Sequence, residues 1–339
     1  MNSLMNRRCC AVAGGGLALL LSTAISAQTE SQAALSVRGD RFMVGAAERF
    51  LVLVSYFDGM NRPAVALARD LDWLRGLGVD GVRVWPNVPP PIMDAGGRLH
   101  PQRLEALHAL IDAAAARGMV VDVSFHREGV CSPPSACGFT VGAFSQGVAA
   151  VAGELSRHRN VLVDLQNEWD VHGDMALADL IGIRGAVQSV NPNLVVTASA
   201  TSNYGEGEAV RAAFDVVAFH GARDPLGRWA LETGDLVRRL RGVQTSQPAR
   251  PIYLQEPNRF PLPGERRPEM DRNPVDYLTA ASQAQRAGAA AWTFHTGAGF
   301  DLSSGTPFAD LLQPGELEVL GRLSTALVAV PWGANAAAR

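Results

Sequence analysis

The stretch Val161–Asp170, which reads VLVDLQNEWD, decides the fold of this chain. It opens with a short, mainly apolar run and ends in polar residues, among them the pair Asn167-Glu168. A short apolar run without strict alternation is typical of a strand that is buried on both faces of a parallel sheet. The stretch therefore predicts a parallel strand over Val161–Gln166 with polar side chains at its carboxyl end.

Seven further runs of the same kind follow the same logic. They are Phe50–Phe57, Gly81–Trp85, Val120–Phe125, Leu194–Ala198, Val216–Phe219, Pro251–Gln255 and Ala290–Phe294. Helical stretches with ordinary punctuation separate them: Pro63 opens one, Pro101–Arg117 ends at Gly118, and Pro274 begins an alanine-rich run that ends at Gly288. Each connection can therefore be a right-handed strand–helix–strand crossover.

Eight such units predict an α/β fold, a (β/α)8 TIM barrel, in a single domain over residues 28–339. A doubly wound open sheet is the competing architecture. It is disfavoured because no G-x-G-x-x-G follows the first strand. The glycine run Gly14-Gly15-Gly16 lies before residue 28, outside the predicted domain.

The charge balance excludes several kinds of partner. The chain has 339 residues and a formal net charge of -3, and all of its basic residues except histidine are arginine. Without a concentrated positive surface we expect no nucleic-acid partner and no electrostatic membrane binding. Without lysine, Schiff-base chemistry and the P-loop lysine are excluded.

The N-terminus is typical of a secretory signal peptide over residues 1–27. Arg7 and Arg8 precede the apolar run Ala11–Leu21, and small residues follow, so we expect cleavage near Ala27 and a secreted or periplasmic protein. A membrane anchor is the alternative, but the run is shorter than the roughly 20 residues that span a bilayer. We expect the mature form to have no membrane association.

Two cysteines would remain in the mature chain. Cys131 and Cys137 lie close together in a Pro/Ser-rich segment of an exported protein, which favours one small disulfide. A metal site is the alternative, but His126 is the only nearby histidine, and zinc needs further ligands at suitable spacing. We expect no metal and no cofactor.

Polar residues close most of the predicted strands. In a TIM barrel the active site lies at the carboxyl ends of the strands, so these residues are the candidates for chemistry. Two of them, Glu168 after the fourth strand and Glu256 after the seventh, are glutamates that would face each other across the mouth of the barrel. Glycoside hydrolysis needs such a pair of carboxyl groups. A solvated loop charge is the alternative for either glutamate alone.

The polar residues that end the successive predicted strands resemble those of glycoside hydrolase clan A and are most similar to those of the family 5 cellulases and mannanases. The resemblance covers nearly all of the predicted mature chain. The positions that carry it are Asn167-Glu168, Glu256, Arg83 in Val-Arg-Val-Trp-Pro, His126, His220 and Trp292.

The resemblance implies a retaining enzyme that acts on a carbohydrate, a β-glucan or β-mannan. Glu168 would be the general acid/base and Glu256 the nucleophile, with about 5 to 5.5 Å between the carboxyl groups. Arg83 would hold Glu256 ionised, whereas burial and negative charge would raise the pKa of Glu168. Asn167 would bind the sugar 2-hydroxyl.

Further residues would bind the substrate. His126 and His220 would line the cleft, with a packed histidine satisfied by the backbone as the alternative for each. Trp292 would provide a sugar-stacking surface, although an aromatic on a barrel strand is more often part of the core. Trp85 would form a further subsite, and so, on weaker grounds, would Trp169, Tyr56 and Phe57.

One position departs from the family pattern. Family members commonly carry a tyrosine two residues after the histidine of strand six, and this chain has Ala222 there. Arg223 or Tyr204 is a candidate to supply the missing contact. A barrel that binds carbohydrate but has lost catalysis is the second hypothesis, and a metal-dependent barrel hydrolase is the third.

Overall fold

The barrel consists of eight parallel strands. The computed structural model describes residues 34–126, 139–172, 175–201, 211–221, 223–224, 226–242, 249–267 and 270–327. The strands are β4 (Leu51–Ser55), β5 (Gly81–Val84), β6 (Val120–Ser124), β7 (Val161–Asp164), β8 (Val195–Thr197), β9 (Val217–Phe219), β10 (Ile252–Leu254) and β11 (Ala291–Phe294). All eight predicted strands are confirmed, each slightly shorter than expected.

Strand order makes the sheet a barrel. Hydrogen bonds join the strands in the order β8-β7-β6-β5-β4-β11-β10-β9, and every pairing is parallel. A parallel bridge between Ala200 and Phe219 closes the ring between β8 and β9. The fold is therefore the expected (β/α)8 TIM barrel.

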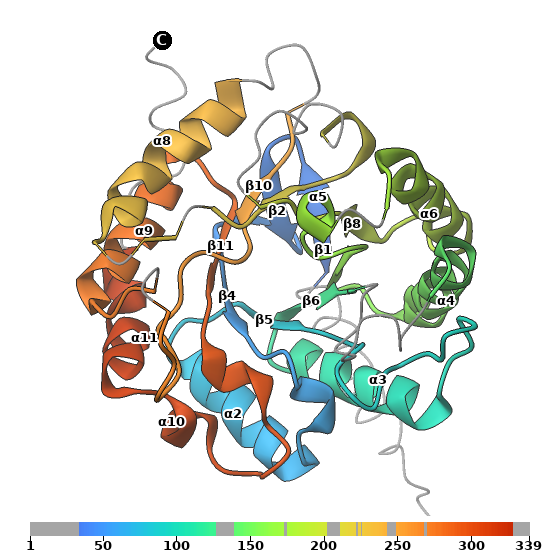
Figure 1. The fold of residues 1–339 in the computed structure, drawn as a ribbon, viewed down its shortest axis with the longest axis horizontal. Helices are drawn as coiled ribbons and strands as arrows, with labels where there is room; N and C mark the ends of the chain where they lie inside the picture. Colours follow the sequence, from blue (N-terminus) through green and yellow to red (C-terminus); the bar gives the residue numbers. More distant parts are fainter. Residues whose placement is uncertain are drawn as a thin grey trace, which may run out of the picture.

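Helices surround the barrel (Figure 1). They are α2 (Ala64–Gly76), α3 (Pro101–Ala115), α4 (Val141–Glu154), α5 (Trp169–His172), α6 (Leu177–Val190), α8 (Arg228–Gly242), α9 (Pro274–Ala287), α10 (Phe308–Leu311) and α11 (Pro314–Ala326). The expected punctuation is present. At α9, the Asn273 side chain caps the first turn by accepting from the Val275 amide, and Gly288 ends the helix at φ 92°.

A small antiparallel sheet was not expected from the polar segment that precedes the barrel. It consists of β1 (Leu35–Arg38), β2 (Arg41–Val44) and β3 (Ala47–Arg49). Leu35 and Phe42 are buried in one apolar cluster with the first residues of barrel strands, such as Leu51 of β4 and Val120 of β6. The Leu35 amide also donates to the Arg159 carbonyl, just before β7. The small sheet therefore closes the amino end of the barrel.

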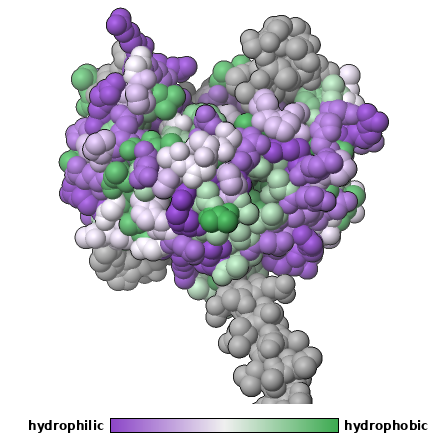
Figure 2. All heavy atoms as spheres, turned by 90° about the horizontal axis from the view of Figure 1, so that it is seen from below, coloured by the Kyte–Doolittle hydropathy of each residue, from purple (hydrophilic) through white to green (hydrophobic). Residues whose placement is uncertain are grey.

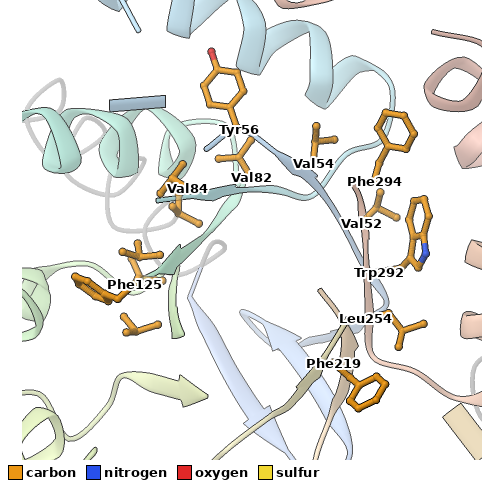
Figure 3. Packing of buried hydrophobic residues seen from close by; sticks show 14 of the residues in the cluster. Val52, Val54, Tyr56, Val82, Val84, Phe125, Phe219, Leu254, Trp292 and Phe294 are labelled. Atoms are coloured by element: carbon orange, nitrogen blue, oxygen red, sulfur yellow. The ribbon is translucent and has the colours of Figure 1, made fainter. Parts of the chain in front are cut away.

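Alternation along each strand separates two cores. In Figure 3, Val52 and Val54 of β4 and Phe294 of β11 belong to the cluster that packs between the sheet and the helices. Leu51 and Leu53, which alternate with the two valines along β4, and Ala291, three residues before Phe294, belong to the cluster inside the barrel. Successive side chains of a strand point to opposite faces, so odd and even positions belong to different layers.

The outer surface carries mostly hydrophilic residues with scattered hydrophobic ones on the face shown in Figure 2. Among the described residues, none of the helices combines the length and apolar character that crossing a membrane requires. The predicted signal peptide and the segment with Cys131 and Cys137 lie outside the described residues.

Candidate active site

The interior of the barrel becomes polar at the carboxyl ends of its strands. Arg83 of β5 is fully buried there, and its guanidinium contacts groups from three other strands. It donates to Glu256 Oε2 at 2.6 Å, to Asn167 Oδ1 at 2.6 Å and to Ser124 Oγ at 2.9 Å. A planar cation with several fixed donors suits this role, because it can bind several acceptors at once. Arg83 therefore joins the ends of β5, β6, β7 and β10.

Glu256 follows β10 and is nearly buried. Besides Arg83, it is bound by Arg223, whose Nη2 donates to Glu256 Oε1 at 2.8 Å. Burial raises its pKa, but the neighbouring His220, His295, Arg83 and Arg223 outweigh that effect and hold the pKa well below its usual range. Glu256 is therefore a carboxylate at neutral pH, as expected. The sequence left open whether Arg223 or Tyr204 would contact Glu256, and the structure shows that Arg223 does. Tyr204 and Ala222 lie outside the described residues.

Glu168 lies in the turn between β7 and α5 with an unusual backbone. Its φ of 50° is in the left-handed region, which costs a residue with a side chain about 1 kcal/mol. Ser199, at the end of β8, holds this conformation by accepting the Glu168 amide at 3.2 Å on its hydroxyl oxygen. Strain of this kind is typical of residues that are held in place for chemistry.

The side chain of Glu168 binds His220 from the end of β9. Glu168 Oε1 lies 2.9 Å from His220 Nδ1, and the Glu168 side chain is 22% exposed. Burial and the charge of Glu256 raise the pKa of Glu168. Its hydrogen bond with His220 and the charges of His220 and Arg223 lower the pKa by more, so the pKa lies below its usual value. The expectation of a raised pKa was wrong, because the sequence did not reveal the histidine contact.

The two glutamates approach each other closely. One oxygen from each carboxylate and a ring nitrogen of His220 all lie within 4.8 Å of one another. Three such ligand atoms have the spacing of a metal site. However, both oxygens of Glu256 already accept from guanidinium groups, whose charge opposes a cation at that position.

The aromatic residues of the site differ from those expected. Trp292 is fully buried in the layer between sheet and helices and points away from the barrel interior (Figure 3). The prediction of a sugar-stacking surface at Trp292 was therefore wrong. Alternation explains the error, because Thr293, the next residue, points into the barrel and contacts the Tyr253 hydroxyl at 2.7 Å.

Trp85 is half-buried beside Arg83 at the mouth. Its ring lies 4.0 Å from that of Phe57, 5.6 Å from that of Phe300 and 6.1 Å from that of His126, measured between centroids. Phe300 is 38% exposed and had no sequence signal. These four rings form an aromatic cluster beside Arg83, whose guanidinium carbon lies 5.4 Å from the centroid of Phe57 and 5.8 Å from that of Trp85.

The three weaker aromatic candidates are buried. Phe57 packs its buried ring against Trp85. Tyr56 donates its hydroxyl to Asp70 at 2.8 Å, and Trp169 belongs to the core outside the barrel. None of the three presents a ring to the mouth, so these predictions were wrong.

His295 is a site residue that was not predicted from the sequence. It follows β11, is buried, and its Nδ1 lies 2.9 Å from the Pro257 carbonyl, to which it donates. Its Nε2 lies 3.8 Å from Glu256 Oε1. Burial lowers the pKa of His295 to about 3, so the ring is neutral at neutral pH. Its position two residues after inward-facing Thr293 was the available signal.

Comparisons with known proteins support the fold. No family model matches the sequence, and no curated protein matches it. Solved structures do match. A glycoside hydrolase family 5 protein from Bacteroides vulgatus is 14% identical with a TM-score of 0.63, over 83% of this chain and 69% of that one.

Two further neighbours have similar scores. An endo-1,4-beta-mannanase from Rhizomucor miehei is 12% identical with a TM-score of 0.62, over 87% of this chain and 99% of that one. A GH5_18 protein from Streptomyces cattleya, solved with GlcNAc, is 17% identical with a TM-score of 0.58, over 84% of this chain and 82% of that one. At these identities the similarity shows a shared fold, which is that of glycoside hydrolase family 5 enzymes.

Proposed function

We propose that this protein is a retaining glycoside hydrolase that cleaves β-linked glycans, with Glu168 as acid/base and Glu256 as nucleophile. The observation that carries the proposal is the pair of carboxylates within 4.8 Å of each other at the mouth of the barrel. Retaining enzymes place their carboxyl groups about 5 to 5.5 Å apart, whereas inverting enzymes leave about 6.5 to 9.5 Å for a water molecule. The short separation favours retention.

The environment of Glu256 suits a nucleophile. Two arginines keep it ionised and fix both of its oxygens. In the first step a carboxylate oxygen attacks the anomeric carbon as the bond to the leaving oxygen breaks, and the glycosyl group becomes an ester of Glu256. The electron pair of the broken bond goes to the leaving oxygen.

Glu168 would deliver the proton that this oxygen needs. The hydrogen bond between Glu168 and His220 would keep that proton at the cleft. In the second step water attacks the anomeric carbon and gives a proton to Glu168, and the ester bond breaks to restore the Glu256 carboxylate. Once Glu256 is an ester, its negative charge is lost and the pKa of Glu168 falls. Glu168 is then a carboxylate and can act as the base in the second step.

Asn167 and the aromatic cluster would bind the sugar. Arg83 holds the Asn167 side-chain oxygen, which leaves the amide nitrogen as the group for a sugar hydroxyl. Trp85 and Phe300 would stack against a sugar ring, and His126 lies beside them. Among the neighbours, the mannanase supports a β-mannan substrate and the protein solved with GlcNAc supports a sugar ligand, and a β-glucan is the other substrate class to test.

The test replaces each glutamate separately. With an aryl β-mannoside or β-glucoside as substrate, Glu256→Ala should lose activity by on the order of 10⁴-fold or more. Azide should restore part of it and give the glycosyl azide of inverted configuration. In Glu168→Ala, azide should give the azide of retained configuration. Glu318→Ala, which removes an exposed glutamate of α11, is the matched control and should behave as wild type.

The outcome against the proposal is equally concrete. Full activity in Glu256→Ala would sink the assignment of the nucleophile. Glycan binding by the wild type without product over long incubation would instead favour the carbohydrate-binding barrel that has lost catalysis.

A further inference from the structure

Gln255 lies directly before Glu256 and is fully buried below the site. Its side-chain nitrogen faces three oxygen atoms inside the barrel. It lies 2.9 Å from Asp122 Oδ2, 3.0 Å from Asp164 Oδ2 and 3.2 Å from Ser124 Oγ. The amide nitrogen is the donor end of the side chain, and these are acceptors that suit it.

These contacts fix which way the amide points. In the opposite orientation the Gln255 carbonyl oxygen would face two carboxyl groups that offer it no donor. Burial raises the pKa of Asp122 to about 6, so this group is a carboxylate above that pH. Asp164 Oδ1 already accepts from the amides of Ser199 and Gln166, and Asp164 Oδ2, which faces Gln255, lies 3.8 Å from the Arg83 guanidinium. The oxygen of Gln255 therefore points the other way, towards His220.

That oxygen determines the tautomer of His220. Gln255 Oε1 lies 3.2 Å from His220 Nε2, and a carbonyl oxygen can only accept, so Nε2 carries a hydrogen. The other ring nitrogen, Nδ1, lies 2.9 Å from Glu168 Oε1. If the ring is neutral, Nδ1 must accept from a protonated Glu168. If the ring is cationic, Nδ1 donates to the Glu168 carboxylate. In both cases one proton lies on this hydrogen bond.

We propose that Gln255 is a positioning residue, which fixes the Nε2–H form of His220 and so keeps one transferable proton between His220 and Glu168. In the other neutral tautomer Nδ1–H would donate to an ionised Glu168, and that hydrogen is not transferable, because its loss would leave an imidazolate anion. The catalytic meaning rests on the function proposed above, whereas the tautomer is a property of the resting protein. The other charged groups around this pair are Glu256, Arg223 and, beyond Glu256, Arg83.

The test is ¹⁵N NMR of the histidine rings at pH 7.5, with the His220 signals assigned by their loss in His220→Gln. In the wild type we expect a protonated Nε2. Gln255→Met keeps the side-chain length but removes the acceptor, and it should shift His220 towards the Nδ1–H tautomer. Tyr253→Phe is the matched control, because Tyr253 donates to the same Asp122 and does not bind His220. It should leave the His220 nitrogen shifts unchanged.

Activity supplies the second readout. Gln255→Met should lower kcat about 10-fold with little change in KM, because it disturbs proton delivery rather than sugar binding. A wild-type His220 in the neutral Nδ1–H form would overturn the proposal without any variant. Unchanged His220 shifts in Gln255→Met, or a changed tautomer with unchanged kcat, would also overturn it. If the wild type cleaves no glycan, the proposed function fails, and the NMR result still decides the tautomer.

Discussion

The two ends of the barrel interior are built on the same eight strands from opposite kinds of residue. At the amino end, leucine, valine and alanine side chains pack with Leu35 and Phe42 of the small sheet. At the carboxyl end, Arg83 and its partners replace them with a connected network of buried charges. An apolar core stabilises on its own, but a buried charge is tolerated only with its partners in place. Stability and chemistry are therefore divided between the two ends.

Removing the charge at the centre of the carboxyl end should have the largest effect. Arg83→Met leaves Glu256 and the nearby Asp122 and Asp164 without their common cation. We expect about 3 to 5 kcal/mol less free energy of unfolding and kcat/KM lower by about 10²-fold or more. Denaturant unfolding and kinetics measure both. Arg184→Met, which breaks the ion pair between α6 and Asp215 before β9, is the control and should leave kcat/KM unchanged. A wild-type kcat in Arg83→Met would remove the network from the mechanism.

Damage to the amino end should separate stability from chemistry. Phe42→Ala empties a nearly fully buried ring position and should lower the free energy of unfolding by about 3 to 5 kcal/mol. Because the small sheet closes the end opposite the site, kcat per folded molecule should stay at the wild-type value. Urea titration gives the first quantity, and kinetics well below the melting temperature give the second. A kcat that falls with stability would show that the two ends are coupled.

A change at the rim of the site should have the smallest effect. Arg223→Gln removes one of the positive charges that lower the pKa of Glu256, while Arg83 and His220 remain. The pKa of Glu256 should rise, and since this group must be ionised to attack, the acidic limb of the kcat/KM profile should move to higher pH. The shift should be below about one unit because Arg223 is partly exposed to solvent. A shift to lower pH would show that Arg223 does not act through charge on Glu256.

The same comparison explains what the sequence could predict. The eight strands were readable because each is a short apolar run with helix punctuation between, as at Pro101 and Gly288. The glutamate pair was readable because both residues directly follow such runs. The small sheet that closes the amino end was not, because its strands are short and partly exposed, so they carry no strong apolar pattern.

Side-chain direction and contacts between distant strands set the limit at the site. Trp292 was misplaced by one position of alternation, and the same alternation would have selected His295. The His220 contact that lowers the pKa of Glu168 joins residues 52 positions apart. In the sequence Gln255 is an ordinary polar residue at a strand end, and only its contacts with Asp122 and Asp164 in the structure show how its side chain is oriented. Such networks are set by strand register, which a single sequence does not specify.

The most direct test of the central claim is to trap the covalent intermediate with a 2-deoxy-2-fluoro glycosyl fluoride and locate it by mass spectrometry of tryptic peptides. Trypsin releases residues 242–259, because the bond between Arg250 and Pro251 resists cleavage, and Glu256 is the only acidic residue in that peptide. We predict that this peptide carries the glycosyl mass. A label on residues 160–184, which contain Glu168, or a first product of inverted configuration would contradict the account.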